Sequence, residues 1–280
     1  MAADYLQPML CHTTDDLPTG AGWVMEPKLD GWRFIFGQRV DGGGVFALGG
    51  RNGADHTDRP GVRPLREAFA KILPPGTVVD CELVAEGNGN ISSDVASRLA
   101  RGGTLIAYVF DVIQVAGHDA RNAPWSERRA LLERLFDGAA LDIVRPVIVS
   151  AVDREVFDAW MAAGLEGVVL KRTESVYRSG KRSRDWLKVK PTKSIDCKIL
   201  ELPRDGRGKF HGQVGSVVFD IGNGKVGRAS GMTDAVRLDM TVNPAKYIGR
   251  MAEFSYQLQT KGGHLRHPNF VRMRPDRDAA

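Results

Sequence analysis

Hydrophobic and polar residues follow two periods along this chain. Apolar side chains three and four positions apart form one helix face, and this spacing predicts helices over residues 63–72, 125–137 and 153–163. Ser126 is the expected N-cap of the second helix, because its hydroxyl can accept a bond from a free backbone N–H. Alternation with a period of two predicts strands over residues 31–40, 78–85, 105–113, 167–172, 186–189, 196–202, 215–221, 225–230 and 250–259.

The predicted secondary structure changes near residue 190, from helices and strands to short strands. All three predicted helices lie before it, whereas the later strands are short and one pair is separated by a tight turn at residues 222–224. Pro191 cannot donate to a sheet ladder, so residues 190–194 are the expected linker. We therefore predict an α+β fold, with a first domain over residues 1–190 and a small β-barrel of the OB-fold type over residues 191–280.

Charge is divided unevenly between these two regions. The whole chain of 280 residues has a net charge of +5. Residues 191–280 hold 15 Lys and Arg against 9 Asp and Glu, which gives +6 and leaves −1 for residues 1–190. A basic module beside a near-neutral one indicates a polyanionic partner.

Composition excludes several classes of protein. Hydrophobic residues make up 42% and charged residues 26%, as in ordinary folded domains. No stretch approaches the ~18 apolar residues of a membrane span, and the N-terminus lacks the features of a secretory signal. Cys11, Cys81 and Cys197 are too far apart for a disulfide framework or a metal knuckle. We therefore expect a cytoplasmic protein without a membrane partner.

Charged side chains interrupt five of the predicted strands or their edges. A charge inside an apolar strand is costly unless it has a partner or a function. Alternation predicts that the members of each group share a strand face: Glu26, Lys28 and Asp30; Asp80 and Glu82; Tyr108, Phe110 and Val112, with Asp111 on the opposite face; Glu166, Val168 and Leu170; and Trp186, Lys188 and Lys190. Five such strands predict a polar cleft lined by sheet.

Seven short motifs occur in a fixed order through residues 23–277. They are Lys-x-Asp-Gly-x-Arg at 28–33, Arg-x-Gly at 51–53, Asp-x-Glu at 80–82, Phe-Asp at 110–111, Glu-Gly-Val-Val-x-Lys at 166–171, Trp-Leu-Lys-x-Lys at 186–190 and Arg-x-Asp-Arg at 274–277. This series resembles the covalent nucleotidyltransferases, and most closely the ATP-dependent DNA ligases of bacteria and phages. Two positions depart from the family pattern: Gly50 replaces the usual Ser or Thr before Arg51, and Arg277 replaces Lys.

The resemblance implies an enzyme that seals nicks in duplex DNA in three steps. Lys28 would attack the α-phosphate of ATP and carry AMP, the AMP would pass to a 5′-phosphate, and a 3′-hydroxyl would then expel it. ATP and Mg²⁺, with Mn²⁺ as a substitute, are the implied cofactors. The implied partner is nicked double-stranded DNA, bound by a monomer that serves replication, repair or recombination.

The resemblance also implies a role for each matched residue. The catalytic set is Lys28, Asp30, Arg33, Glu82, Glu166, Lys188 and Lys190, and the metal ligands are Asp80, Glu82 and Glu166. The nucleotide contacts are Glu26 to the adenine amine, Phe110 and either Val168 or Val169 to its two faces, Lys188 and Lys190 to the α-phosphate, Arg33 and Arg51 to ribose or the nick phosphate, and Arg274, Asp276 and Arg277 to the triphosphate.

Three further expectations accompany this interpretation. Only about 22 residues precede the first motif, so we expect a minimal two-domain ligase without a separate N-terminal DNA-binding domain. Residues 204–209 (Arg-Asp-Gly-Arg-Gly-Lys) predict a flexible, DNA-facing loop of the barrel. The alternatives are an RNA ligase, a capping-type guanylyltransferase, or a non-catalytic DNA-binding module, which would have lost the lysine or the acids.

Overall fold

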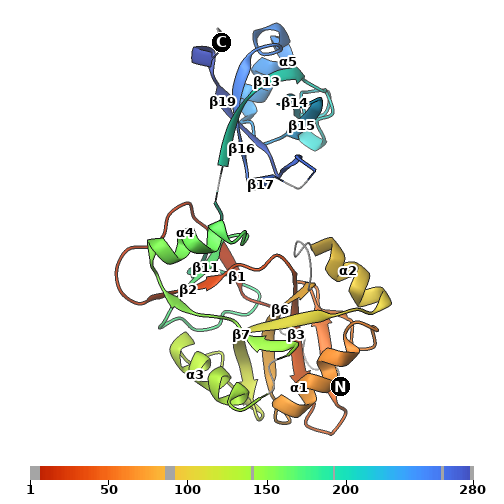
Figure 1. Ribbon diagram of the computed structural model, residues 1–280, viewed down its shortest axis with the longest axis vertical. Coiled ribbons are helices and arrows are strands. Elements are labelled where there is room, and N and C mark those ends of the chain that lie inside the picture. Colours follow the sequence, from red (N-terminus) through yellow and green to blue (C-terminus); the bar gives the residue numbers. More distant parts are fainter. Residues whose placement is uncertain (1–6, 86–91, 140–141, 192, 260–261, 278–280) are drawn as a thin grey trace. The chain divides into compact units, whose positions relative to one another are not determined.

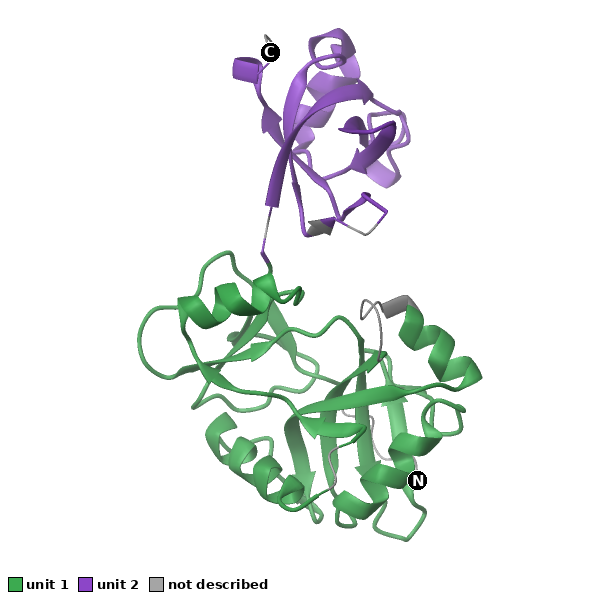
Figure 2. Ribbon diagram, in the orientation of Figure 1, with its two compact units in different colours: residues 1–190 green, residues 191–280 purple. Residues whose placement is uncertain are grey.

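The chain folds into two compact units, residues 1–190 (unit 1) and 191–280 (unit 2; Figure 2). The computed structural model describes residues 7–85, 92–139, 142–191, 193–259 and 262–277. Within these ranges no helix is both long and apolar enough to cross a membrane.

Two sheets form the framework of unit 1 (Figure 1). The larger one has the order β5-β4-β3-β6-β7-β8, and β9 also pairs with β7; its strands are β3 (Trp32–Gln38), β4 (Val45–Gly49), β5 (Ala54–Asp55), β6 (Val78–Ala85), β7 (Leu105–Val115), β8 (His118–Asp119) and β9 (Val144–Pro146). The smaller one has the order β1-β12-β11-β2-β10, built from β1 (Leu10–Thr13), β2 (Trp23–Pro27), β10 (Ser150–Ala151), β11 (Val168–Arg172) and β12 (Arg182–Val189).

In the described part of unit 1, four helices cover these sheets: α1 (Arg63–Ile72), α2 (Ser92–Arg101), α3 (Trp125–Phe136) and α4 (Arg154–Ala162). The main core lies between the larger sheet and its helices, where the rings of Phe36 and Phe69 stack with centroids 4.5 Å apart. The expected N-cap of the second predicted helix is wrong. Ser126 lies inside α3, whose N-cap is Pro124 without a side-chain bond.

One helix of unit 1 was not expected from the pattern. The described part of α2 buries only Val95 and Leu99 in the core, so its apolar face is too narrow to stand out in a mostly polar segment.

Unit 2 is a small barrel with a sheet order of β15-β14-β13-β16-β19. An isolated parallel bridge between Ser230 and Asn269 links the two edges of this sheet, and the rings of Phe219 and Phe254 stack in its core with centroids 3.8 Å apart. Its elements are β13 (Lys193–Glu201), β14 (Val217–Gly222), β15 (Lys225–Ala229), β16 (Met251–Tyr256), β17 (Leu258–Gln259), β18 (Leu265–Arg266), β19 (Asn269–Met273), α5 (Asp234–Val242), and the 3₁₀ turns η1 (Gly208–Phe210), η2 (Pro244–Lys246) and η3 (Pro275–Arg277).

The start of unit 2 differs from the predicted linker. Lys193 and Ser194 already pair with Tyr256 and Ser255, so the barrel begins inside the predicted 190–194 segment, of which residue 192 lies outside the described residues.

Helix α5 of unit 2 was not predicted, because its apolar residues follow a run of strand-like segments. The turn prediction is confirmed: Asn223 and Gly224 have φ values of 54° and 71°, as a tight hairpin turn requires.

Candidate active site

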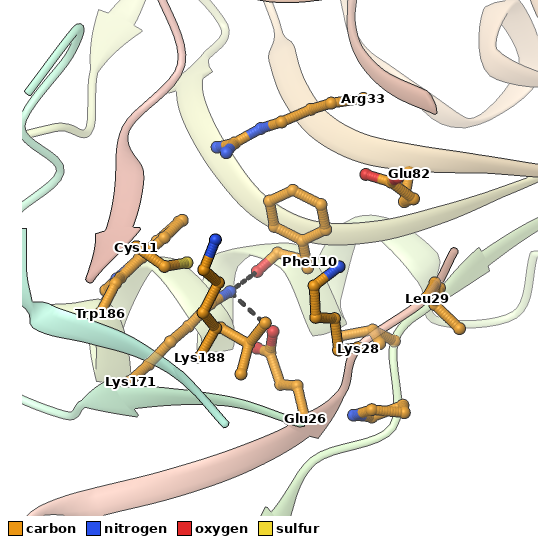
Figure 3. Close-up of a pocket in the computed structure, with 13 residues that line it drawn as sticks. Cys11, Glu26, Lys28, Leu29, Arg33, Glu82, Phe110, Lys171, Trp186 and Lys188 are labelled. Carbon is orange, nitrogen blue, oxygen red and sulfur yellow. Dashed lines mark hydrogen bonds and ion pairs between the residues drawn. The ribbon is translucent and has the colours of Figure 1, made fainter. Parts of the chain in front are cut away.

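A pocket of about 130 Å³ lies in unit 1. It collects side chains from both sheets, and Figure 3 shows Lys28 and Lys188 projecting into it beside the ring of Phe110. Its walls are formed by Cys11, Glu26, Pro27, Lys28, Leu29, Arg33, Glu82, Phe110, Val147, Val169, Lys171, Trp186 and Lys188.

Lys28 directly follows β2, in the segment that connects β2 to β3. Its Nζ lies 2.5 Å from Glu166 Oε2, and the other carboxylate oxygen of Glu166 pairs with Lys190. Burial alone would raise the pKa of Glu166, but the two ammonium groups outweigh burial and lower it. Glu166 is therefore an ionised carboxylate shared between two lysines.

Glycine is required at two positions around this lysine. A Cβ at Gly167, whose φ is 151°, would lie 2.2 Å from Val189 O. A Cβ at Gly31 would lie 2.1 Å from Leu83 O. Only glycine allows these close backbone approaches, which hold Glu166 beside Lys190 and hold the segment after Lys28 against β6.

A buried ion pair forms the floor of the pocket. Lys171 Nζ lies 2.9 Å from Glu26 Oε2, and both side chains are at most 3% exposed. Lys171 also donates to the backbone oxygen of Phe110 at 2.9 Å (Figure 3). The second oxygen of Glu26, Oε1, is buried and has no partner among the described residues. This acceptor is available to a donor on a bound molecule.

A β-bulge directs the Phe110 side chain into the pocket. In the β6–β7 ladder Asp80 faces Asp111 and Cys81 faces Val109, which leaves Phe110 as the extra residue. The expectation that Phe110 and Val112 share a face is therefore wrong. Val112 packs in the main core, whereas Phe110 lines the pocket, with Lys171 Nζ 4.7 Å from its ring centroid.

Arg33 and Asp80 form a second charged network behind this ring. Arg33 donates to both carboxylate oxygens of Asp80, at 2.9 and 2.5 Å, and its guanidinium lies 5.1 Å from the Phe110 centroid. Tyr177 also donates to Asp80, at 2.5 Å. Asp80 is fully buried and does not line the pocket, so the structure does not bring this expected metal ligand to the site.

Glu82, in contrast, does line the pocket. Its Oε1 accepts a bond from the backbone N–H of Gly31 at 3.2 Å. Burial raises the pKa of Glu82 to about 7, although Lys28 and Arg33 act to lower it. On the opposite wall, burial together with the like charges of Lys190 and Lys28 lowers the pKa of Lys188.

Other expected residues fall in different places. Val169, not Val168, lines the pocket, because Val168 packs beside Leu170 in the core of the smaller sheet. Arg51 is exposed and is not among the residues that line the pocket. Asp30 does not line it either, since β2 ends at Pro27 and the alternation from Glu26 stops there.

Three contributors were not singled out from the sequence. Lys171 was visible as the last residue of Glu-Gly-Val-Val-x-Lys, but it received no role. Tyr177 holds Asp80 and Cys11 lines the pocket, and neither position carries a local sequence signal for these contacts.

In unit 2 the last expected residues form a charged cluster. Arg274 makes a bidentate contact with Asp276, at 3.0 and 2.9 Å, and its Nη1 lies 3.1 Å from Asp196 Oδ2. Arg277 Nε lies 3.8 Å from Asp196 and from Asp276. Two of the expected triphosphate contacts are thus engaged with carboxylates of their own unit.

Family models match both units. The model of the ATP-dependent DNA ligase domain matches residues 8–190, and that of the DNA ligase OB-like domain matches residues 205–274. The chain therefore belongs to the ATP-dependent DNA ligase family, as the motifs implied, and the predicted fold class is confirmed.

Individual relatives agree with this assignment. The chain is 31% identical to the multifunctional non-homologous end joining protein LigD of Pseudomonas aeruginosa over 99% of its length, and 33% identical to a probable DNA ligase of Mycolicibacterium gilvum over 75%. It spans only 36% and 43% of those two proteins. The crystal structure of the ligase domain of M. tuberculosis LigD matches 97% of this chain and 96% of that one, with a TM-score of 0.60 and 25% identity.

Proposed function

We propose that this protein is an ATP-dependent DNA ligase that seals nicks between a 5′-phosphate and a 3′-hydroxyl. The observation that carries the proposal is the placement of Lys28. Its amine projects into a pocket that also holds an aromatic ring, Phe110, and a second lysine, Lys188. An amine nucleophile, a stacking surface and a cation for phosphate are the three features that self-adenylylation needs.

In the first step Lys28 Nζ attacks the α-phosphorus of ATP. A nitrogen–phosphorus bond forms, the bond between the α-phosphorus and its bridging oxygen breaks, and pyrophosphate leaves. Glu166 Oε2, 2.5 Å from Nζ, is placed to accept the proton that the amine must lose. Lys188 and Lys190 stabilise the charge on the phosphate oxygens, and Arg274 and Arg277 supply further cations to the leaving group.

The adenine base is proposed to lie against Phe110 and Val169, above the Glu26–Lys171 pair. The unpartnered Oε1 of Glu26 can accept from the exocyclic amine of adenine. Guanine has a carbonyl at that position, which would face an acceptor and leave it unsatisfied. This arrangement favours ATP over GTP.

The carboxylate of Glu82 fits a divalent cation in this pocket. Among the described residues no three His, Cys, Asp or Glu side chains cluster closely enough to hold a metal alone. Mg²⁺ usually keeps several waters and is bound through one or two carboxylates. Such an ion, when bound, would neutralise phosphate charge. Glu82 is the residue proposed to hold it, because both carboxylate oxygens of Glu166, the other expected ligand, are paired with Lys28 and Lys190.

In the second and third steps AMP passes from Lys28 to the 5′-phosphate, and the 3′-hydroxyl then attacks that phosphorus and expels AMP. These steps need no new nucleophilic side chain, only a DNA strand held in position.

A compact basic loop of unit 2 is suited to hold DNA backbone. Residues 203–215 are closed by bonds from Gly206 N to Gln213 O and from Gly215 N to Pro203 O, so the loop has more internal structure than its composition predicted. At its base the guanidinium of Arg237 stacks 4.2 Å from the ring of Phe210.

Labelling with α-³²P-ATP tests the proposal. Wild type should retain the label on a denaturing gel in the presence of Mg²⁺ and release it when nicked duplex is added and sealed. Lys28→Ala should retain none, and neither should Lys28→Arg, which keeps the positive charge beside Glu166. The matched control is Lys71→Ala, an exposed lysine of α1, which should behave as wild type.

The contrary results are equally distinct. Labelling by GTP in place of ATP would favour a capping-type enzyme, and discharge to RNA alone would favour an RNA ligase. If folded wild-type protein retained no label, the result would favour a DNA-binding protein that is not catalytic.

A further inference from the structure

The arginine tail of unit 2, residues 274–277, is held by partners of two kinds. Asp276 belongs to the tail itself and lies two residues from Arg274, so their bidentate pair can move as one piece. Asp196 belongs to β13, and its Oδ2 lies 3.1 Å from Nη1 of Arg274. That second pair must break before the guanidinium can leave the sheet.

Among the carboxylates outside the tail, Asp196 is the main partner of the Arg274 side chain. Glu253 is farther from Arg274, at 3.9 Å, and already accepts a bond from Arg272 at 2.7 Å. The backbone N–H of Arg274 donates to Met251 O at 2.8 Å, which fixes the main chain at this position. A change of partner therefore involves the side chain of Arg274 rather than its backbone.

The pair is also placed where exchange is possible. The side chains of Arg274 and Asp196 are 18% and 24% exposed, so neither is sealed from an incoming anion. Arginine binds phosphate oxygens with the same fork of N–H groups that it uses for carboxylates. A triphosphate carries more negative charge than a single carboxylate and can displace it.

We propose that Asp196 holds Arg274 in a resting position and competes with the triphosphate of ATP for its guanidinium. This inference rests on the proposed function, in which Arg274 contacts the leaving pyrophosphate. Asp196 is then a positioning residue of the first step alone. Its effect is to raise the ATP concentration needed for self-adenylylation, and the sealing of a nick that already carries AMP does not involve it.

The test compares Asp196→Asn with wild type in two assays. In single-turnover labelling, the ATP concentration that gives the half-maximal rate should fall about two- to fivefold, the range of a part-exposed ion pair. The maximal labelling rate and the sealing of a pre-adenylylated nick should both stay unchanged. Glu201→Gln is the matched control, because Glu201 is exposed on the same strand and pairs with no basic residue among those described. It should equal wild type in both assays.

Arg274→Ala tests separately whether Arg274 contacts the triphosphate, which the resting contact with Asp196 presupposes. If Arg274→Ala does not raise the ATP concentration for half-maximal labelling, the proposed role of the tail is wrong. If Arg274→Ala does raise this ATP concentration, but Asp196→Asn matches wild type or needs more ATP, then only the proposal that Asp196 holds Arg274 in a resting position is wrong. Adding Asp196→Asn to Arg274→Ala should bring no further change if Asp196 acts through Arg274. A further change would mean that Asp196 also acts through Arg277, whose Nε lies 3.8 Å from it, and would overturn a route through Arg274 alone.

Discussion

Fully buried ion pairs lie in unit 1, whereas the described ion pairs of unit 2 are all partly or largely exposed. In unit 1 the pairs Glu26–Lys171 and Asp111–Arg128 have side chains that are at most 3% exposed. In unit 2 a pair such as Lys209–Asp234 has side chains that are 72% and 68% exposed. The first kind of pair is permanent, because neither charge could remain in the interior without the other. The second kind is weak and can exchange with an external anion.

This difference matches the tasks proposed for the two units. Arg128 donates to Asp111 and also to the backbone oxygens of Ala123 and Ser175, so α3, β7 and the segment after β11 are held together. A pocket that positions a phosphorus atom for attack benefits from such rigidity. A surface that grips and releases DNA backbone benefits instead from charges that give up their protein partners readily.

The largest effect should come from breaking a buried pair. Arg128→Leu leaves the Asp111 carboxylate buried without its cation, with only the bond from the Val112 backbone N–H remaining, and we expect the free energy of unfolding to fall by about 3–5 kcal/mol. Urea denaturation followed by circular dichroism measures it. The control is Arg154→Leu, which removes an exposed pair with Asp158 and should cost less than about 1 kcal/mol. Similar losses for the two variants would contradict the contrast between buried and exposed pairs.

A smaller effect should appear in the pH dependence of unfolding. Burial raises the pKa of Glu82 from its ordinary value of 4.5 to about 7 in the folded protein, so the folded state keeps a proton that the unfolded chain has released. Stability should therefore fall as the pH rises through this window. Between pH 5 and pH 8, with EDTA present, wild type should lose about 2–3 kcal/mol more than Glu82→Gln. Parallel pH profiles would show that Glu82 is ionised throughout.

Two neighbouring valines provide a narrower comparison within unit 1. Val168→Ala removes buried methyl groups from the core and should lower the free energy of unfolding by about 2 kcal/mol. Val169→Ala should cost less stability, because this side chain is only partly buried, but it should weaken ATP-dependent labelling more. If Val168→Ala weakened labelling more than Val169→Ala did, Val168 would be the valine that contacts the bound nucleotide.

The same valines show what the sequence pattern could predict. Motif order was enough to predict the family, but it did not predict that Glu166 is the carboxylate that pairs with Lys28. The choice between Val168 and Val169 depended on counting alternate residues from Glu166. Gly167, with φ at 151°, breaks the extended backbone between Glu166 and β11, so the count starts on the wrong face.

Phe110 illustrates the other limit of pattern reading. Its bulge inserts one residue into β7, and the residues on either side keep a strand-like composition. Nothing in a period of two marks such an insertion, because the bulge is stabilised by contacts distant in sequence, such as the bond from Lys171 to the Phe110 backbone. The sequence pattern also could not predict that Asp80 bonds to Arg33 and Tyr177, because these contacts arise from tertiary packing.

The smallest expected effect lies at an exposed pair of unit 2. Asp234→Asn removes the carboxylate 2.9 Å from Lys209 and leaves that lysine free to contact phosphate. Binding of nicked duplex at low salt should strengthen about two- to threefold, and the gain should shrink as salt screens the added charge. The free energy of unfolding should change by less than about 1 kcal/mol. Asp158→Asn makes the same charge change at an exposed pair of unit 1, where we expect no gain in affinity. An equal gain from both variants would mean that net charge, rather than the loop of unit 2, governs the grip on DNA.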